Sequence, residues 1–289
     1  MRILLTGAGG QVGGELAQLL PAHGEVIALD RAALDLAKPD AIARAMRDVK
    51  PDLVVNAGAY TAVDLAERER EAAFAVNARA PQVFAEEAKR IGALLIHYST
   101  DYVFDGRATS PYDESAPTGP LNVYGESKLE GERAIAASAA HAIVLRTSWV
   151  YGLTGKNFLM TIRRLARERD ELRIVADQFG TPNWSRSLAQ ATQSLVGLGI
   201  AALAERSGLY HLSSAGVTTW HGFASAIVGD AAKTRVTPIA TAEYPTPARR
   251  PAYGALASER FDGTFGIRLP AWQEALAACL ASDRGGTRG

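Results

Sequence analysis

The sequence lacks several features that would point to particular classes of protein. Cys279 is the only cysteine among 289 residues, so neither an intrachain disulfide nor a cysteine-based zinc site can form. Basic and acidic residues each number 31, which gives a net charge of zero. Such a balance argues against duplex nucleic acid or an anionic membrane as a partner, although a local basic pocket is compatible with it.

Long hydrophobic runs are also missing. No stretch approaches the roughly 20 apolar residues that a transmembrane helix needs. The apolar run 1–6 is interrupted by Gly7, which makes it too short for a signal peptide. Together with the single cysteine, these absences predict a protein of the reducing cytoplasm that binds neither membrane nor nucleic acid.

What is present is an alternation of short apolar segments with longer segments of helical periodicity. The expected strands are Arg2–Thr6, Glu25–Asp30, Leu53–Ala57, Ala93–Ser99 and Ala142–Arg146. The expected helices are Gln11–Leu20, Pro39–Val49, Arg68–Arg90 with Pro81 as a candidate break, and Val123–Ser138. This order is typical of an α/β protein with a doubly wound, Rossmann-type parallel sheet, whose ligand crevice lies beyond the carboxyl ends of the strands.

The composition changes after Trp149. Glycine, proline and aromatic residues become denser, for example in Gln178–Ser185, Gly208–Trp220 and Glu243–Tyr253. We therefore expect a dinucleotide-binding domain over 1–150 and a smaller, substrate-binding lobe over 151–289. Some segments of the second part are expected to return to the first domain, so the lobe is predicted to be discontinuous.

A glycine-rich segment joins the first expected strand to the first expected helix. Glycines allow a tight turn and let the backbone approach a pyrophosphate, and the N-terminus of the helix supplies N–H donors. An ordinary strand-to-helix turn is the alternative. We expect this segment to bind a dinucleotide through Gly7, Gly10, Gln11, Val12 and Gly13.

Two neighbouring residues after the second strand bear on the choice of cofactor. Asp30 lies where a carboxylate commonly binds the adenosine ribose hydroxyls, whereas the guanidinium of Arg31 could pair with a 2′-phosphate. The two signals oppose each other, so NADH and NADPH are both compatible. The third strand ends in residues that would let the cofactor pass closely over the sheet, namely Ala57, Gly58, Ala59 and Tyr60.

Tyr124 and Lys128 lie four residues apart on the expected helix 123–138, so they share one face. A tyrosine with a pKa of about 10 is a poor acid near neutrality, and a neighbouring ammonium lowers that pKa. In a carbonyl reduction Tyr124 would protonate the oxygen as hydride reaches the carbon, which contributes roughly 10²–10⁴-fold. Lys128 could also hold the nicotinamide ribose.

A Tyr-x-x-x-Lys pair alone is usually a coincidence on a helix surface. Here the segment 98–101 places hydroxyl groups at the end of a strand, at the mouth of the expected crevice. Either Ser99 or Thr100 could hydrogen-bond a substrate oxygen and orient it toward Tyr124. The combination with the glycine-rich segment is what indicates a reductase.

These motifs together resemble the extended short-chain dehydrogenase/reductases. Matching stretches run along nearly the whole chain, at Gly7–Gly13, His97–Gly106, Pro120–Lys128, Arg146–Tyr151, Asp177–Pro182, Gly208–Leu212 and Pro245–Pro251. The second, fourth and last of these are similar to the branch that reduces the 4-keto group of dTDP-4-dehydro-L-rhamnose to dTDP-L-rhamnose, a precursor of lipopolysaccharide and other cell-surface polysaccharides. The resemblance implies an NAD(P)H-dependent oxidoreductase that acts on a nucleotide sugar.

The resemblance also implies roles for individual residues. The catalytic triad would be Thr100, Tyr124 and Lys128. The cofactor, NADPH or NADH, would be lined by Asp30, Asp35, Leu36 and the residues of Ala57–Tyr60. The dTDP-linked sugar would contact Thr100, Asp101 and Trp149, although a core aromatic is the alternative for Trp149. One of Arg249 and Arg250 would pair with the diphosphate, because a guanidinium fork suits phosphate oxygens, and a structural ion pair is the alternative for either.

Some members of this family dimerise through magnesium held by glutamates of two helices. This chain keeps Glu15 but has Arg186 in the second region, in the run 183–186, where an acid is expected. A permanent positive charge opposes a dication there. We therefore expect no dimer-bridging magnesium, and either a monomer or a homodimer formed without metal.

Two other functions are compatible with parts of this pattern. A sugar-nucleotide dehydratase or epimerase of the same superfamily is one, but a similar dehydratase carries Thr-Asp-Glu after the strand, and Tyr102 occupies the glutamate position here. The other is a regulatory subunit that binds cofactor without catalysis. Oxidation of NAD(P)H in the presence of a dTDP-4-keto sugar would separate an enzyme from such a subunit.

Overall fold

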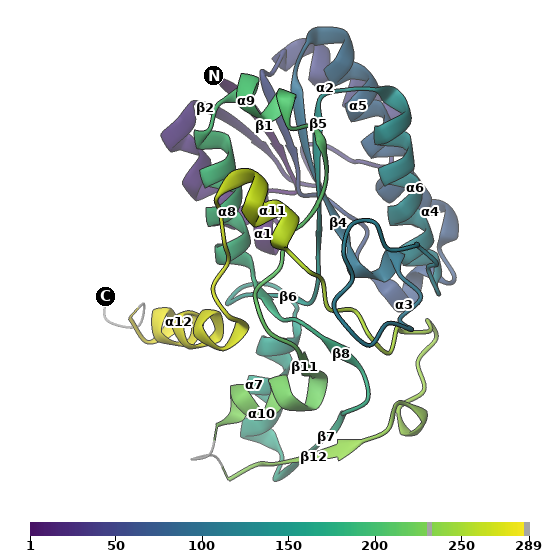
Figure 1. Cartoon of the computed structure of the whole chain (residues 1–289), viewed down its shortest axis with the longest axis vertical. Coiled ribbons are helices and arrows are strands. Elements are labelled where there is room, and N and C mark those ends of the chain that lie inside the picture. Colours follow the sequence, from purple (N-terminus) through teal and green to yellow (C-terminus); the bar gives the residue numbers. More distant parts are fainter. Residues whose placement is uncertain (230–232, 286–289) are drawn as a thin grey trace.

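A six-stranded parallel sheet forms the centre of the computed structural model, which describes residues 1–229 and 233–285 (Figure 1). Its strands, in spatial order, are β10 (Gly208–His211), β5 (Ala142–Thr147), β4 (Leu94–Thr100), β3 (Leu53–Asn56), β1 (Arg2–Thr6) and β2 (Glu25–Leu29). All neighbouring pairs run parallel. The predicted doubly wound α/β sheet is therefore confirmed.

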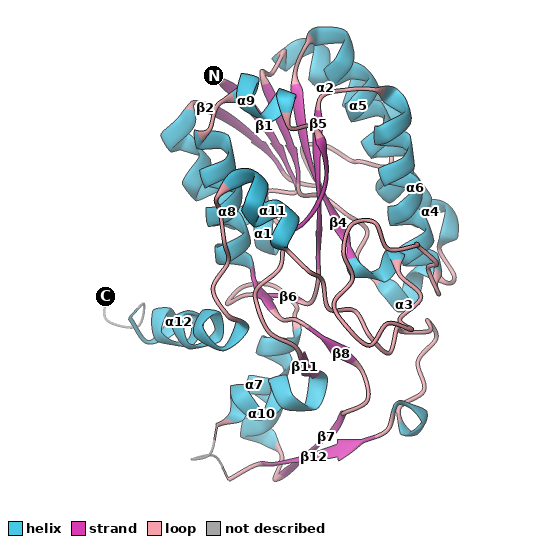
Figure 2. Cartoon of the chain, viewed as in Figure 1, coloured by secondary structure: helices cyan, strands magenta, loops and turns pink. Residues whose placement is uncertain are grey.

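Helices cover both faces of this sheet (Figure 2). One face packs against α2 (Pro39–Val49), α5 (Ala80–Ile91) and α6 (Val123–Ser138), and the other against α1 (Gln11–Leu19), α8 (Ser185–Gly197), α9 (Ile200–Glu205) and α11 (Glu259–Phe265). Successive residues of a strand point to opposite faces, so Leu4 and Val54 join one core while Leu5 and Val55 join the other. Burial on both sides explains why these strands are apolar throughout rather than alternating.

The predicted helix Val123–Ser138 is confirmed, whereas the predicted helix Arg68–Arg90 is subdivided. It comprises α4 (Arg70–Phe74), the π-helical segment η2 (Ala75–Arg79) and α5, preceded by the short α3 (Val63–Ala66). Pro81 lies in the first turn of α5 and has no N–H to give to the preceding turn. The π-helical widening before it accommodates that missing hydrogen bond.

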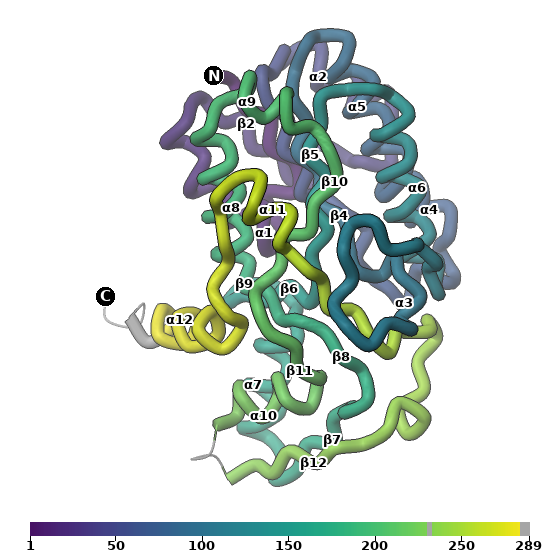
Figure 3. Tube along the Cα trace, viewed as in Figure 1, coloured from purple at the N-terminus to yellow at the C-terminus, as the bar shows by residue number. Residues whose placement is uncertain are grey.

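The second half of the chain contributes to two cores. A smaller one contains α7 (Phe158–Glu168), β7 (Glu171–Val175), α10 (Trp220–Val228) and α12 (Trp272–Gly285), with β12 (Arg235–Ile239) paired to β7. Short pairs β6 (Val150–Tyr151) with β9 (Asn183–Trp184), and β8 (Phe179–Gly180) with β11 (Thr218–Thr219), connect it to the sheet. The remaining turns of helix are η1 (Leu20–His23), η3 (Asp101–Val103) and η4 (Thr241–Glu243). Figure 3 shows α8, α9, β10 and α11 passing back to the large core, so this half of the chain is shared between the two. No helix in the described ranges is long and apolar enough to cross a membrane.

A buried ion pair ties α6 to the sheet. Arg146 of β5 donates from Nε and Nη2 to the two carboxylate oxygens of Glu132 at 2.9 and 2.6 Å. Ser99 of β4 donates to the same carboxylate at 2.5 Å. The Arg146 and Glu132 side chains are only 3% and 8% exposed, so the pair is shielded from solvent. The helix that carries Tyr124 and Lys128 is thereby fixed against two strands.

We predict that Arg146→Met lowers the free energy of unfolding by about 3–5 kcal/mol, because it leaves the Glu132 carboxylate buried without its cation. Arg164→Met is the matched control, since Arg164 pairs with Glu168 on the exposed face of α7. That change should alter stability by less than about 0.5 kcal/mol. Urea unfolding of the two variants measures both values, and equal small losses would contradict a structural role for the buried pair.

Candidate active site

The glycine-rich segment forms a close crossing between β1 and α1. Gly7 has φ +71°, in the left-handed region that favours glycine. A Cβ on Gly13 would lie 2.0 Å from the carbonyl oxygen of Gly7, so only glycine fits there. Gly10 is the N-cap of α1 and no side chain caps that end, while the buried Oε1 of Gln11 has no hydrogen-bond partner within the described chain. A backbone cradle with uncapped N–H groups fits a pyrophosphate.

The other residues predicted to line the cofactor adjoin this cradle. A Cβ on Gly58 would lie 2.5 Å from the buried Leu36, and one on Gly7 would lie 2.5 Å from the amide nitrogen of Gly58. Asp30 lies beside the glycine loop, and its Oδ1 accepts from the amides of Ala32 and Ala33 at 3.0 and 2.9 Å. Of the remaining predicted residues, Asp35 accepts from the amide of Ala37, and Val12 packs against the large core. Arg31 and Ala59 are exposed, whereas Ala57 is half-buried beside Gly7. The backbone of Tyr60 is hydrogen-bonded to the Asn77 side chain.

Tyr124 lies in the first turn of α6, whose N-cap is Asn122. The Asn122 side chain accepts from the amide of Gly125 at 2.8 Å, which fixes where the helix begins. Burial raises the pKa of the Tyr124 hydroxyl to about 12, and a hydrogen bond with Thr100 opposes that rise. Thr100 and Tyr124 are thus brought together at the carboxyl end of β4.

Lys128 is 2% exposed and lies one turn further along α6. Its Nζ donates to the carbonyl oxygen of Tyr98 at 2.5 Å and lies 3.2 Å from Nε2 of His97. Burial lowers the pKa of Lys128 to about 8, and the Glu132 carboxylate opposes that fall. The Lys128 amine therefore contacts β4. The spacing of Tyr124 and Lys128 predicts a lowered pKa for Tyr124, whereas in the structure that pKa is above its ordinary value.

Asp101 follows Thr100 directly and is 2% exposed. Its Oδ1 accepts from the Thr100 hydroxyl at 3.1 Å, while the buried Oδ2 has no partner within the described chain. Burial raises the pKa of Asp101 to about 7. A Cβ on Gly254 would lie 2.4 Å from Oδ2, so the segment around Gly254 passes directly over this carboxyl group.

Trp149 lies at the junction between the sheet and the smaller core, in a strained conformation. Its φ is +42°, which is rare for a bulky residue. Its ring stacks on Trp220 with centroids 3.6 Å apart and planes 9° apart, and a Cβ on Gly180 would lie 2.5 Å from a carbon of the same ring. Such strain persists where the surroundings fix a residue, and it often accompanies function.

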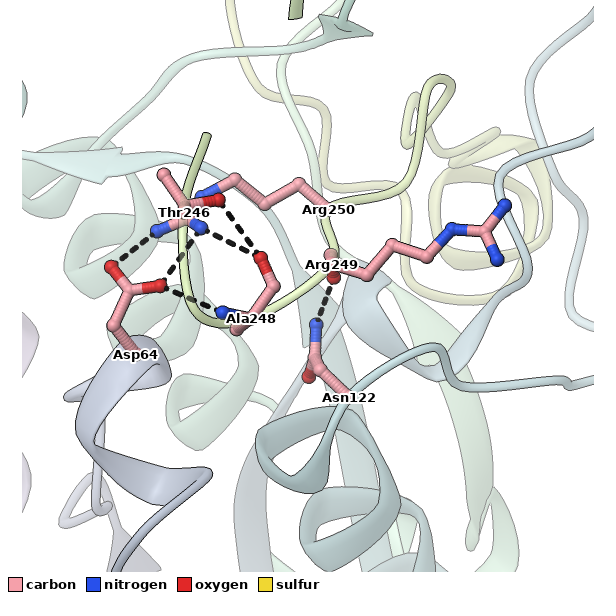
Figure 4. Close-up of polar contacts among 6 residues, drawn as sticks. All are labelled: Asp64, Asn122, Thr246, Ala248, Arg249 and Arg250. Carbon is pink, nitrogen blue, oxygen red and sulfur yellow. Dashed lines mark hydrogen bonds and ion pairs between the residues drawn. The ribbon is translucent and has the colours of Figure 1, made fainter. Parts of the chain in front are cut away.

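The two arginines of the predicted diphosphate site have different surroundings (Figure 4). Arg250 donates from Nη1 and Nη2 to the two carboxylate oxygens of Asp64, on α3, at 2.9 and 2.8 Å. The amide of Ala248 also donates to Asp64, at 3.1 Å. Figure 4 shows the exposed Arg249 side chain extending away from this pair, while its carbonyl oxygen accepts from Asn122 at 2.8 Å. Arg250 is in a structural ion pair, and the guanidinium of Arg249 has no contact with the other residues drawn.

Three comparisons connect this geometry with known proteins. The chain matches the family described as "RmlD substrate binding domain" over residues 1–284. It is 51% identical to a dTDP-4-dehydrorhamnose reductase of Burkholderia thailandensis, across 97% of this chain and 98% of that protein. The chain belongs to the dTDP-4-dehydrorhamnose reductase family.

Solved structures of dTDP-4-dehydrorhamnose reductases have the same fold. The enzyme of Clostridium acetobutylicum superposes with a TM-score of 0.92 at 35% identity, covering 98% of this chain and all of that one. The enzyme of Bacillus anthracis, solved in complex with NADP, superposes with a TM-score of 0.91 at 33% identity, covering 97% and 99%. The family resemblance inferred from the motifs is confirmed.

Glu15 and Arg186, on which the expectation about magnesium rests, lie on α1 and α8. Glu15 is half-buried and Arg186 is exposed. Within residues 1–229 and 233–285, no group of three or more His, Cys, Asp or Glu side chains is arranged to hold a metal.

Sequence reasoning missed several residues that surround the candidate site. Asn56 and His97 are fully buried polar side chains beneath Lys128, and Trp220 supports Trp149. His97 and Asn56 each end an apolar strand pattern with a polar residue, which is a usable signal. Trp220 and Gly254 gave no such signal, because their contacts depend on how distant segments meet.

We predict that Gly13→Ala weakens NADPH binding roughly tenfold or more, because the added methyl group forces Gly7 and α1 apart and overpacking costs about 1–3 kcal/mol. Gly14→Ala is the matched control, since its Cβ would meet its nearest neighbour at an ordinary 3.5 Å. Calorimetric titration with NADPH should leave that variant near wild type. Equal affinities for both variants would show that the crossing does not shape the cofactor site.

Proposed function

We propose that this chain reduces the 4-keto group of dTDP-4-dehydro-L-rhamnose to dTDP-L-rhamnose with NADPH, and that NADH can replace NADPH. The observation that carries the proposal is the meeting of Thr100, at the end of β4, with Tyr124, in the first turn of α6, beside a cradle that fits a dinucleotide. The dTDP-4-dehydrorhamnose reductase at 51% identity supports the substrate, and the relative solved with NADP supports the cofactor.

The chain's residues then have distinct tasks. Tyr124 donates the proton to the carbonyl oxygen, and Thr100 hydrogen-bonds that oxygen and orients it. A nicotinamide held by the cradle would supply the hydride. Lys128 contributes positive charge that favours the tyrosinate formed in this step and holds the nicotinamide ribose. The tyrosinate is the costly species, because burial disfavours it, so the Lys128 charge matters most as the proton leaves.

Cofactor choice depends on the edge of the cradle. The Oδ1 atom of Asp30 already accepts from two amides of the following turn, whereas the exposed Arg31 is available to a 2′-phosphate. We therefore favour NADPH, with Gly7, Gly10, Gln11, Val12 and Gly13 around the pyrophosphate and with Asp30, Asp35, Leu36, Ala57, Gly58, Ala59 and Tyr60 along the remainder. No bridging magnesium is needed for this reaction, and we propose a monomer or a metal-independent homodimer acting in the cytoplasm.

The sugar nucleotide would lie between the sheet and the smaller lobe formed mainly by residues 151–289. Asp101 adjoins Thr100, and Trp149 lies at the junction with the lobe. These positions support contacts of both residues with the sugar. Arg249 is our candidate for the diphosphate, because the guanidinium of Arg250 is already paired with Asp64.

We predict that Tyr124→Phe lowers turnover roughly 10²–10⁴-fold with cofactor affinity unchanged, because only the proton donor is removed. NADPH and NADH oxidation with dTDP-4-dehydro-L-rhamnose measures turnover, and calorimetry measures cofactor affinity. Tyr112→Phe is the control, since that hydroxyl bonds Asp105 and the amide of Ala108 away from the site. Near-normal turnover of Tyr124→Phe would refute the assignment, and inactivity of the unaltered chain toward this sugar would refute the substrate.

We predict that Arg249→Ala raises KM for the sugar nucleotide about tenfold or more, because a hydrogen bond to a charged group contributes about 1.5–3 kcal/mol. Its melting temperature should stay at the wild-type value, since Arg249 is exposed. Arg250→Ala should instead lower the melting temperature, because it leaves Asp64 without its partner. The reverse pattern, with KM raised only in Arg250→Ala, would assign the diphosphate to Arg250.

A further inference from the structure

A line of buried polar side chains crosses the sheet, from Thr6 of β1 through Asn56 of β3 and His97 of β4 to Lys128 of α6. Thr6 donates to Oδ1 of Asn56 at 2.8 Å, and Nδ2 of Asn56 lies 3.1 Å from Nδ1 of His97. Nε2 of His97 lies 3.2 Å from Nζ of Lys128. These four residues are at most 2% exposed, so solvent does not replace any of these contacts. The proposed reaction gives no task to His97 or Asn56.

The orientation of the Asn56 amide determines which nitrogen of His97 carries the proton. The backbone N–H of Gly58 can only donate, and it lies 3.3 Å from Oδ1 of Asn56. The amide NH₂ group of Asn56 therefore faces His97 and donates to Nδ1. A neutral imidazole with an unprotonated Nδ1 carries its hydrogen on Nε2. Burial holds the pKa of His97 well below its usual range, which keeps the ring neutral.

The Nε2–H of His97 consequently points at the Lys128 amine. An ammonium has three donors and no acceptor, whereas a neutral amine can accept from Nε2–H. His97 thus favours the neutral form of Lys128 and leaves the Tyr98 carbonyl as the acceptor that the structure gives its ammonium. The charged group acting in the opposite direction is Glu132 on α6, whose carboxylate is shared with Arg146 of β5 and Ser99 of β4.

We propose that His97, held in one tautomer by Asn56, is a positioning residue that sets the pH range over which Lys128 keeps its proton. This inference rests on the proposed function, in which the charge of Lys128 supports proton donation by Tyr124. The reduction should lose rate as pH rises and Lys128 becomes neutral. His97 therefore determines where the basic limb of the pH profile falls, without touching substrate or cofactor.

The first test measures the tautomer directly. In ¹⁵N-labelled enzyme, imidazole nitrogen shifts distinguish protonated from unprotonated nitrogens, and we expect the His97 proton on Nε2. A proton on Nδ1 would overturn the proposal, because Nε2 would then accept from the ammonium. This measurement needs no substrate, so its outcome is independent of whether the chain reduces the proposed sugar.

The second test replaces the donor facing Lys128 with an acceptor. In His97→Gln the amide oxygen can accept from the ammonium, so we expect the basic limb of kcat, and the Lys128 pKa followed by ¹⁵Nζ shift, to rise by about one pH unit or more. His221→Gln is the control, since His221 lies on α10, away from the sheet, and its Nε2 is 3.3 Å from the carbonyl oxygen of Val236. It should leave both values in place.

The outcomes separate the inference from the function it rests on. An unchanged Lys128 pKa and an unchanged basic limb in His97→Gln would show a merely structural role for His97 and overturn the proposal. A raised Lys128 pKa in a chain that does not reduce the sugar would instead refute the proposed function and leave the His97 effect standing. If His97→Gln fails to fold, the tautomer measured in the unaltered enzyme still decides.

Discussion

The contact between Glu132 and Arg146 is the constraint on which the site depends. Charges this deeply buried are stable only when paired, and the strands β4 and β5 supply both the guanidinium and the additional Ser99 hydroxyl. The pairing sets the rotation and the height of α6 above the sheet. It thereby also sets the positions of Tyr124 and Lys128, because each of them lies close to a whole number of helical turns from Glu132 on the same helix.

The N-terminus of α6 is fixed by a different type of contact. Asn122 caps its first turn and simultaneously donates to the carbonyl oxygen of Arg249, so the start of α6 is joined to a segment 127 residues later in the chain. Asp64 binds the same segment through Arg250 (Figure 4). A helix held at its N-terminus by hydrogen bonds and at its middle by charge has little freedom to tilt, which suits the proposed reaction, because that reaction depends on the placement of the Tyr124 hydroxyl.

The sequence predicted what is local. Apolar strands, the glycine-rich turn and the face shared by Tyr124 and Lys128 are encoded within short windows, and the structure has the corresponding strands, turn and helix. Contacts between segments that are distant in the sequence could not be predicted from it. The spacing of Tyr124 and Lys128 does not reveal that the Lys128 amine is directed at β4, because His97 and the Tyr98 carbonyl come from another element. The sequence could not distinguish the roles of Arg249 and Arg250, which are adjacent. They differ in the structure because α3 places Asp64 beside Arg250.

The strand order has a consequence for how the chain reaches this structure. β10 completes the sheet beside β5, yet 60 residues separate the end of β5 at Thr147 from the start of β10 at Gly208. Until those residues are synthesised, β5 presents an unpaired, apolar edge of the kind that recruits other strands. During synthesis at about 5–20 residues per second, that edge is open for several seconds. The return of the chain to the first domain therefore also covers an aggregation-prone edge of β5.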